Sequence, residues 1–293
     1  MNKTKITGLV GGALLLCGTQ AQAEITWRFD SDDSVSTRFT TLDDASVKQV
    51  SGGVTATVQA WSNTGDRSGV GSTSSSTAET YTLDTAYLSV YGGGIGVKNR
   101  DASSEYYYPN NVKTLNPNGD NKENNDPEHS TDNDQRYDSV LFSFSSAIDL
   151  NSVSIGWSGI DSDITVLAYT GVGAPVMSGK TYAELASSGW GLVEHYSNVA
   201  SNSDSGSVDK QNVNPGNVKS SYWLIGAYNP LVGNNQGWTL GNDYVKLLAL
   251  SGDKYIPPPP PHGNPEPGTL LLMGAGLLGL TRIRARRVVR SAA

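Results

Sequence analysis

The chain has 293 residues, of which 37% are hydrophobic and 17% charged, enough for one large domain or two small ones. Residues 24–255 carry 14 basic and 27 acidic side chains, a net charge of −13, which disfavours nucleic acid or anionic lipid as a partner. The 33 glycines, 14 tyrosines and six tryptophans are typical of a β-rich extracellular protein and not of a helical cytosolic enzyme.

Residues 1–23 have the pattern of a secretory signal peptide. Lys3 and Lys5 precede an apolar run from Ile6 to Cys17, and Ala21 and Ala23 form a small-x-small cleavage site before Glu24. The run is too short for a confident membrane anchor. We therefore expect export and removal of Cys17, the one cysteine of the sequence, which leaves the mature chain without a disulfide.

Residues 24–255 predict an all-β domain, an antiparallel β-sandwich or jelly roll. In the segment 54–61, apolar and polar residues alternate as in a strand with one face inward. About ten short strands follow one another between turn-forming residues. Strands are predicted over 24–30, 54–61, 81–97, 161–171, 189–197, 221–230 and 244–252, with two more in 138–157 split at 145–151, one short helix at 180–188, and loops at 62–80 and 98–138.

The end of the sequence differs from the polar body before it. A run of five prolines, 257–261, favours a stiff extended spacer over 256–264. The tripeptide Pro265-Glu266-Pro267 follows, then an apolar stretch over 268–280, then Arg282, Arg284, Arg286 and Arg287. Arginines beyond an apolar segment are retained on the cytoplasmic side of a membrane. We expect a single short hydrophobic helix that holds the exported protein in the inner membrane transiently.

This three-part arrangement over residues 265–293 resembles the PEP-CTERM sorting signal of Gram-negative bacteria that produce exopolysaccharide. The resemblance implies recognition by an exosortase, a membrane-embedded enzyme that would cut near the Pro-Glu-Pro motif and deliver the body to the cell surface or beyond. Four patches of the body, 60–65, 88–101, 128–144 and 153–169, are similar to exosortase-dependent surface proteins. That similarity indicates where the protein is located more than what activity it has.

Catalytic motifs are scarce in the sequence. His129, His195 and His262 have no metal-binding spacing, and neither HExxH nor GxSxG occurs. A Ser/His/Asp triad through His129 or His195 stays open because such groups meet only in space. We expect no enzymatic activity, with a secreted hydrolase as the alternative from another class.

Two kinds of binding site are suggested by the loops. Asp132, Asn133, Asp138, Asp161 and Asp163 offer the hard oxygen ligands that calcium takes at loop edges, although no EF-hand spacing is present. Solvated or turn-forming acids are the alternative. Tyr106, Tyr107 and Tyr108 could stack against sugar rings or pack over the sheet as a lid.

The sequence therefore predicts an exported surface or extracellular-matrix protein with a structural or adhesive role. A glycan- or calcium-dependent lectin-like module is the alternative within binding functions. The expected partners are an exosortase, the inner membrane transiently, and an exopolysaccharide. The one cofactor that the sequence suggests is calcium.

Overall fold

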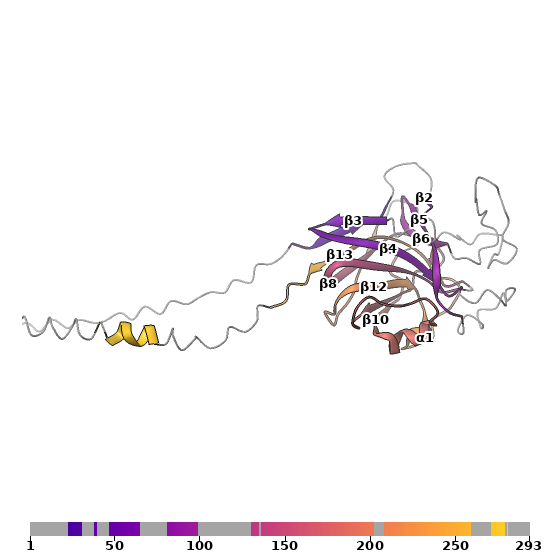
Figure 1. Cartoon of the computed structure of the whole chain (residues 1–293). Helices are drawn as coiled ribbons and strands as arrows, with labels where there is room; N and C mark the ends of the chain where they lie inside the picture. Colours follow the sequence, from indigo (N-terminus) through magenta and orange to yellow (C-terminus); the bar gives the residue numbers. More distant parts are fainter. Residues whose placement is uncertain are drawn as a thin grey trace, which may run out of the picture. The chain divides into compact units, whose positions relative to one another are not determined.

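The computed structural model describes residues 23–30, 38–39, 47–64, 81–98, 130–134, 136–201, 208–258, 271–278 and 280. The chain divides into two units, Met1–Tyr255 and Ile256–Ala293, each considered by itself. The described residues of the first unit are mostly in β-strands (Figure 1). Its described strands are β1 (Ile25–Arg28), β2 (Arg38–Phe39), β3 (Val47–Ser51), β4 (Val54–Ser62), β5 (Asp84–Tyr91), β6 (Gly94–Lys98), β7 (Thr131–Asp132), β8 (Asp138–Ser158), β9 (Ile164–Tyr169), β10 (Trp190–Tyr196), β11 (Asp209–Asn212), β12 (Lys219–Ala227) and β13 (Tyr244–Lys254).

These strands form one hydrogen-bonded sheet in the order β1-β13-β6-β5-β4-β8-β12-β9-β10, with β2, β3, β7 and β11 added at its margins. All of the pairings between strands are antiparallel. The all-β antiparallel class predicted from the sequence is thus confirmed at this coarser level.

The 21-residue strand β8 joins the two halves of the sheet. Its first part, up to about Asp149, pairs with β4 and β12, and its second part, Ile148–Ser158, pairs with β13 and β11. The prediction of two strands split at 145–151 is therefore wrong. Ile148 and Leu150 are fully buried, and the residues next to them are only half-buried. This alternation of side chains continues through the polar stretch 145–151, so the chain does not turn there.

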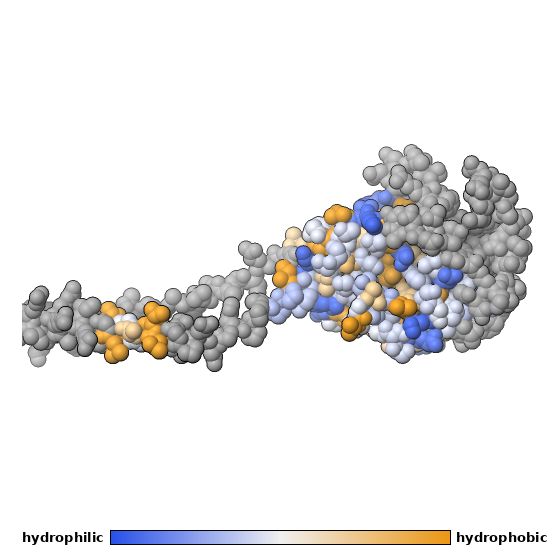
Figure 2. Space-filling view, viewed as in Figure 1, coloured by the Kyte–Doolittle hydropathy of each residue, from blue (hydrophilic) through white to orange (hydrophobic). Residues whose placement is uncertain are grey.

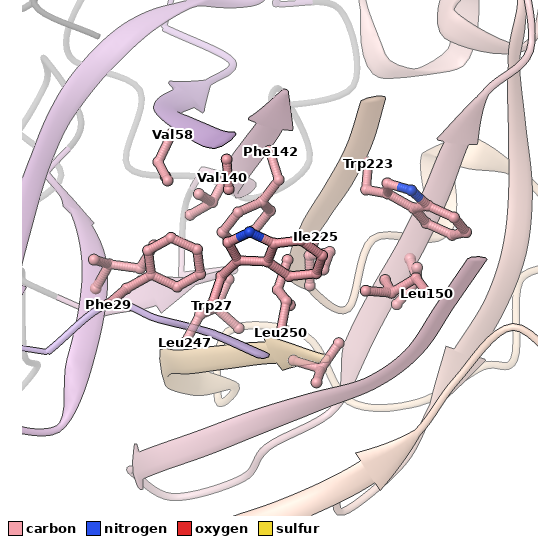
Figure 3. Close-up of a cluster of buried hydrophobic side chains, with 14 of the residues drawn as sticks. Trp27, Phe29, Val58, Val140, Phe142, Leu150, Trp223, Ile225, Leu247 and Leu250 are labelled. Atoms are coloured by element: carbon pink, nitrogen blue, oxygen red, sulfur yellow. The ribbon is translucent and has the colours of Figure 1, made fainter. Parts of the chain in front are cut away.

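The main core lies between these halves. Alternate residues of β4 point inward, so that Val54, Ala56 and Val58 are fully buried. They meet side chains from β1, β5, β6, β8, β9, β12 and β13 in a single cluster. Figure 3 shows Trp27 of β1 and Phe29, just after this strand, gathered with Phe142, Leu247 and Leu250. Strands from both ends of the sheet order share this cluster, so the sheet curls around it.

A second, smaller cluster covers the opposite face of β8, β9 and β12. Leu141, Leu167 and Leu224 pack there against the helix α1 (Tyr182–Leu185) and its surroundings. A capping box holds the start of this helix, because Thr181 and Glu184 exchange hydrogen bonds between side chain and backbone. A 3-10 turn, Ala186–Ser188, completes the segment. The helix predicted over 180–188 is confirmed.

The described surface of the β-domain is mostly polar, with scattered apolar spots (Figure 2). In the second unit, residues 271–278 and 280 are helical, and their apolar side chains are exposed. No helix among the described residues is long and apolar enough to cross a membrane. The C-terminal hydrophobic helix is therefore present but short.

Candidate functional site

Three carboxylates converge at one corner of the β-domain. Asp161 and Asp163 lie between β8 and β9, and Asp243 immediately precedes β13. One carboxylate oxygen of each lies within 4.8 Å of those of the other two. Asp161 and Asp243 form an isolated parallel bridge, in which the Asp161 N–H donates to Asn242 O (2.9 Å) and the Tyr244 N–H donates to Asp161 O (3.1 Å). We call Asp161, Asp163 and Asp243 the acidic corner.

Asn133 holds this corner together from the loop after β7. Its Nδ2 donates to Asp243 Oδ2 (2.6 Å) and to Tyr228 O (3.0 Å). Its Oδ1 accepts the N–H groups of Gly241 (3.0 Å) and Asp243 (3.2 Å). All four bonds that a side-chain amide can make are used, so Asn133 fixes both the backbone and the carboxylate of Asp243.

Other carboxylate oxygens of the corner also accept hydrogen bonds. Asp243 Oδ1 accepts the Asp163 N–H (2.9 Å), and Asp163 Oδ1 accepts the Asn198 N–H (2.7 Å). Asn242 donates from Nδ2 to Asp161 Oδ2 (3.2 Å). The Oδ1 of this same amide is buried and has no hydrogen-bond partner among the described residues. The corner therefore combines three carboxylates with one unsatisfied amide oxygen.

Burial makes the ionised form of this corner costly. Asp243 is fully buried, and this burial, together with the charges of Asp163 and Asp161, raises its pKa to about 7 against the opposing hydrogen bonds. Burial also raises the pKa of Asp163, with a smaller contribution from the charge of Asp161. A proton or a bound cation would relieve this repulsion.

The structure brings together three of the five residues that the sequence suggested as calcium ligands. Asn133, Asp161 and Asp163 meet at the acidic corner. Asp132 lies beside it on β7, opposite Tyr244, and accepts from Ser130 and from the Asp134 N–H. Asp138 begins β8 and pairs with Ser62, so it belongs to a different part of the sheet.

Asp243 was missed by sequence reasoning. It lies 80 residues beyond Asp163 in a chain with 28 acidic residues. The available signal was its place directly before the apolar strand β13, the counterpart of Asp163 before β9.

His195 is the one histidine among the described residues. Its Nδ1 lies 2.9 Å from Thr165 Oγ1, and its Nε2 lies 2.8 Å from Gly233 O. Because Nε2 faces a carbonyl, it carries the proton, and Nδ1 accepts from the threonine hydroxyl. Burial lowers the pKa of His195. No carboxylate is hydrogen-bonded to this ring among the described residues.

Several predicted sites lie outside the described residues. They are Tyr106, Tyr107 and Tyr108, the sorting residues Pro265, Glu266 and Pro267, the basic residues Arg282, Arg284, Arg286 and Arg287, and Ala21 of the signal cleavage site. Ala23 is described and is exposed just before β1.

Comparison with known proteins identifies the tail and not the body. Residues 265–287 match a family model described as the PEP-CTERM protein-sorting motif. No curated protein matches the chain. The motif implies export, processing by an exosortase and association with the cell surface. This chain is thus a protein that carries a PEP-CTERM sorting signal at its C-terminal end.

Proposed function

We propose that the domain over residues 24–255 is a non-enzymatic structural or adhesive component of the cell surface or extracellular matrix, delivered there by an exosortase. The sorting motif at 265–287 carries this proposal. The signal peptide starts export, the apolar stretch and arginines hold the tail in the inner membrane transiently, and cleavage near Pro265–Pro267 releases the body. The proline-rich segment 256–264 keeps the cleavage site clear of the folded domain.

The body is suited to a passive role outside the cell. The sheet curled around one large core supports the predicted sandwich-like, jelly-roll-like arrangement, which derives its stability from burial and backbone pairing. A non-enzymatic role is also supported by the burial of Thr165 and His195, because the one hydroxyl that contacts this histidine ring among the described residues is closed off from solvent and from a substrate.

A gene deletion in the producing cells tests this role. The deletion should reduce attachment to surfaces or cell–cell aggregation, and the full-length chain should restore it. A chain ending at Tyr255 should be exported but should not restore it, since it lacks the sorting signal. Unchanged attachment and aggregation in the deletion strain would contradict the structural or adhesive role.

We also propose, as a second candidate, that the acidic corner binds calcium and makes the domain a calcium-dependent module. The favouring observation is the meeting of three carboxylates within 4.8 Å of one another beside the unsatisfied Oδ1 of Asn242. Calcium takes carboxylate and amide oxygens in irregular geometry, which suits this set. Its charge would offset the burial cost and the smaller repulsion from Asp163 and Asp161 that together raise the pKa of Asp243.

Thermal unfolding of the purified domain tests the calcium site. A ligand at 100 times its dissociation constant stabilises a protein by about 2.7 kcal/mol, so added calcium should raise Tm above its value in chelator. Asp161→Asn should abolish this shift, and Asp253→Asn, at a distant half-buried carboxylate bonded to Asn151, should preserve it. Equal Tm values with calcium and with chelator would eliminate this candidate.

A further inference from the structure

One loop of the acidic domain carries no charge. Residues 229–241, NPLVGNNQGWTLG, contain no acidic or basic side chain, although the domain around them has a net charge of −13. The loop joins β12 to β13, and the amide side chains of Asn234, Asn235 and Gln236 belong to exposed residues along it. Trp238 follows, and this residue is partly exposed. We call Asn234, Asn235, Gln236 and Trp238 the amide–aromatic loop.

Trp238 rests on rigid support. Its ring packs on that of Tyr228, with centroids 4.9 Å apart, and meets the edge of His195 at 6.3 Å. Tyr228 is fully buried. The Tyr228 hydroxyl donates to Asn235 Oδ1 (2.9 Å) and accepts the Gln236 N–H (2.8 Å). The indole is therefore fixed from below by a ring that is itself held by the loop.

The backbone of the loop is also fixed in one shape. Asn229 caps a 3-10 turn, Pro230–Val232, by accepting the Leu231 N–H. Gly233 O accepts from His195, Gly237 N–H donates to Asn235 Oδ1, and Gly241 N–H donates to Asn133. Asn234, with φ near +50°, takes a left-handed conformation that asparagine tolerates better than most residues. A surface ordered in advance loses little entropy on binding a ligand.

The composition of this surface selects among ligand classes. A charged ligand would meet no counter-charge on the loop. Gln236 Nε2 already donates to Asn234 O, and Asn235 Oδ1 accepts from Tyr228 and Gly237, but a large apolar ligand would leave the remaining hydrogen-bonding capacity of these amides unused. An uncharged polyhydroxylated ligand fits both parts, because its C–H faces can stack on the indole while its hydroxyl groups exchange hydrogen bonds with amides. Tryptophan is also enriched at binding surfaces, where it offers a large contact area and few torsions to fix.

We propose that the amide–aromatic loop binds a neutral oligosaccharide chain, with Trp238 as the stacking platform and Asn234 and Gln236 as hydrogen-bonding groups. This inference rests on the proposed adhesive role and names the chemical class that the domain would adhere to. This loop shares no residue with the tyrosines at 106–108 that the sequence suggested for sugar binding.

Calorimetric titration of the folded domain tests the site, with the neutral probes cellohexaose, laminarihexaose and maltohexaose and the acidic probe hexagalacturonate. At least one neutral hexasaccharide should bind and the acidic one should not. Trp238→Ala should weaken that binding at least about tenfold. Because this variant also removes packing against Tyr228, Asn234→Gly provides a second test. Glycine accepts the same positive φ, so Asn234→Gly removes only the amide, and binding should weaken about three- to tenfold. Trp157→Phe, at a half-buried tryptophan on β8, should leave affinity unchanged.

The proposal would be overturned if no neutral probe bound at millimolar concentration. It would also be overturned if Trp238→Ala and Asn234→Gly both bound the probe with wild-type affinity. Preferential binding of hexagalacturonate would also overturn it, since the loop was assigned to uncharged chains. The cellular deletion test is separate: reduced adhesion of the deletion strain combined with no binding of neutral probes removes this inference alone. Unchanged adhesion would remove the proposed role even if an oligosaccharide binds.

Discussion

Raising the pH from 5 to 8 should destabilise the domain through Asp243. This carboxyl is fully buried, and its pKa is raised from 3.8 to about 7. Between these two values the folded state keeps a proton that the unfolded state has released. Stability therefore falls as pH rises through this window and levels off above about pH 7. Asp243 therefore favours the folded state when it is protonated, whereas a salt-bridged carboxylate favours the folded state when it is ionised.

The magnitude follows from the two pKa values. The full difference corresponds to about 4 kcal/mol, at roughly 1.4 kcal/mol for each pKa unit. Part of this is already lost at pH 5, because the unfolded carboxyl is mostly ionised there. The expected loss between pH 5 and pH 8 is about 2.5 kcal/mol. The raised pKa of Asp163 acts in the same direction.

Urea unfolding in the presence of chelator measures this loss, and Asp243→Asn isolates its source. Asparagine places an NH2 group opposite the Asp163 N–H or the Asn133 amide, so this variant should be about 1–3 kcal/mol less stable than wild type at pH 5, where the wild-type Asp243 is protonated. The informative quantity is the difference between wild type and variant, which cancels the opposite contribution of His195. That difference should shrink by about 2.5 kcal/mol from pH 5 to pH 8. Asp253→Asn should keep the wild-type slope. A difference that is constant with pH would show that Asp243 does not hold a proton in the folded state at pH 5.

Three further predictions concern the packing of the domain. Trp27→Ala should cost about 3–5 kcal/mol in urea unfolding, because a fully buried indole is lost together with its edge-to-face contact with Phe144 and its hydrogen bond to Val54 O. A cost below about 1 kcal/mol would show that the core collapses around the gap. Gly94→Ala should lower Tm or prevent folding, since Gly94 has φ +115° and an added Cβ would lie 2.5 Å from Leu247 O. Gly53→Ala, also at positive φ but with open space around it, should cost only about 1 kcal/mol; equal effects would contradict the steric argument. Lys246 lies between the rings of Tyr91 and Trp157, and burial lowers its pKa from 10.5 to about 8. Wild-type stability should therefore rise relative to Lys246→Met as pH increases from 8 to 10.5, by about 3 kcal/mol; parallel curves would be the contrary result.

Local pattern was enough to predict the strands that bury one face. The alternation in 54–61 predicts β4 because every second residue enters the core. The margin strands could not be predicted in this way. β11 reads Asp-Lys-Gln-Asn and has only exposed and half-buried positions, so its strand geometry comes from pairing with β8 and not from its own residues.

The candidate site shows the same limit. Asp161 and Asp163 are close in sequence and could be proposed as a pair from their place before β9. Asn133 and Asp243 join them only because β7 pairs with β13. This pairing places Asn133 Nδ2 2.6 Å from Asp243 Oδ2, although the two residues are 110 positions apart in the sequence. Such a meeting depends on tertiary structure, and a single sequence gives no signal for it. The sorting motif, by contrast, is contiguous, and it was therefore predictable from the residues alone.

Mass spectrometry of the protein recovered outside its native cells shows whether an exosortase cuts the tail. In cells with the exosortase, the mass should correspond to a chain that begins at Glu24 and ends near Pro265–Pro267. In cells without the exosortase, the chain should keep its C-terminal residues and stay with the membrane. An intact C-terminus in both kinds of cell would show that the tail is an ordinary anchor and would contradict its assignment as a cleaved sorting signal.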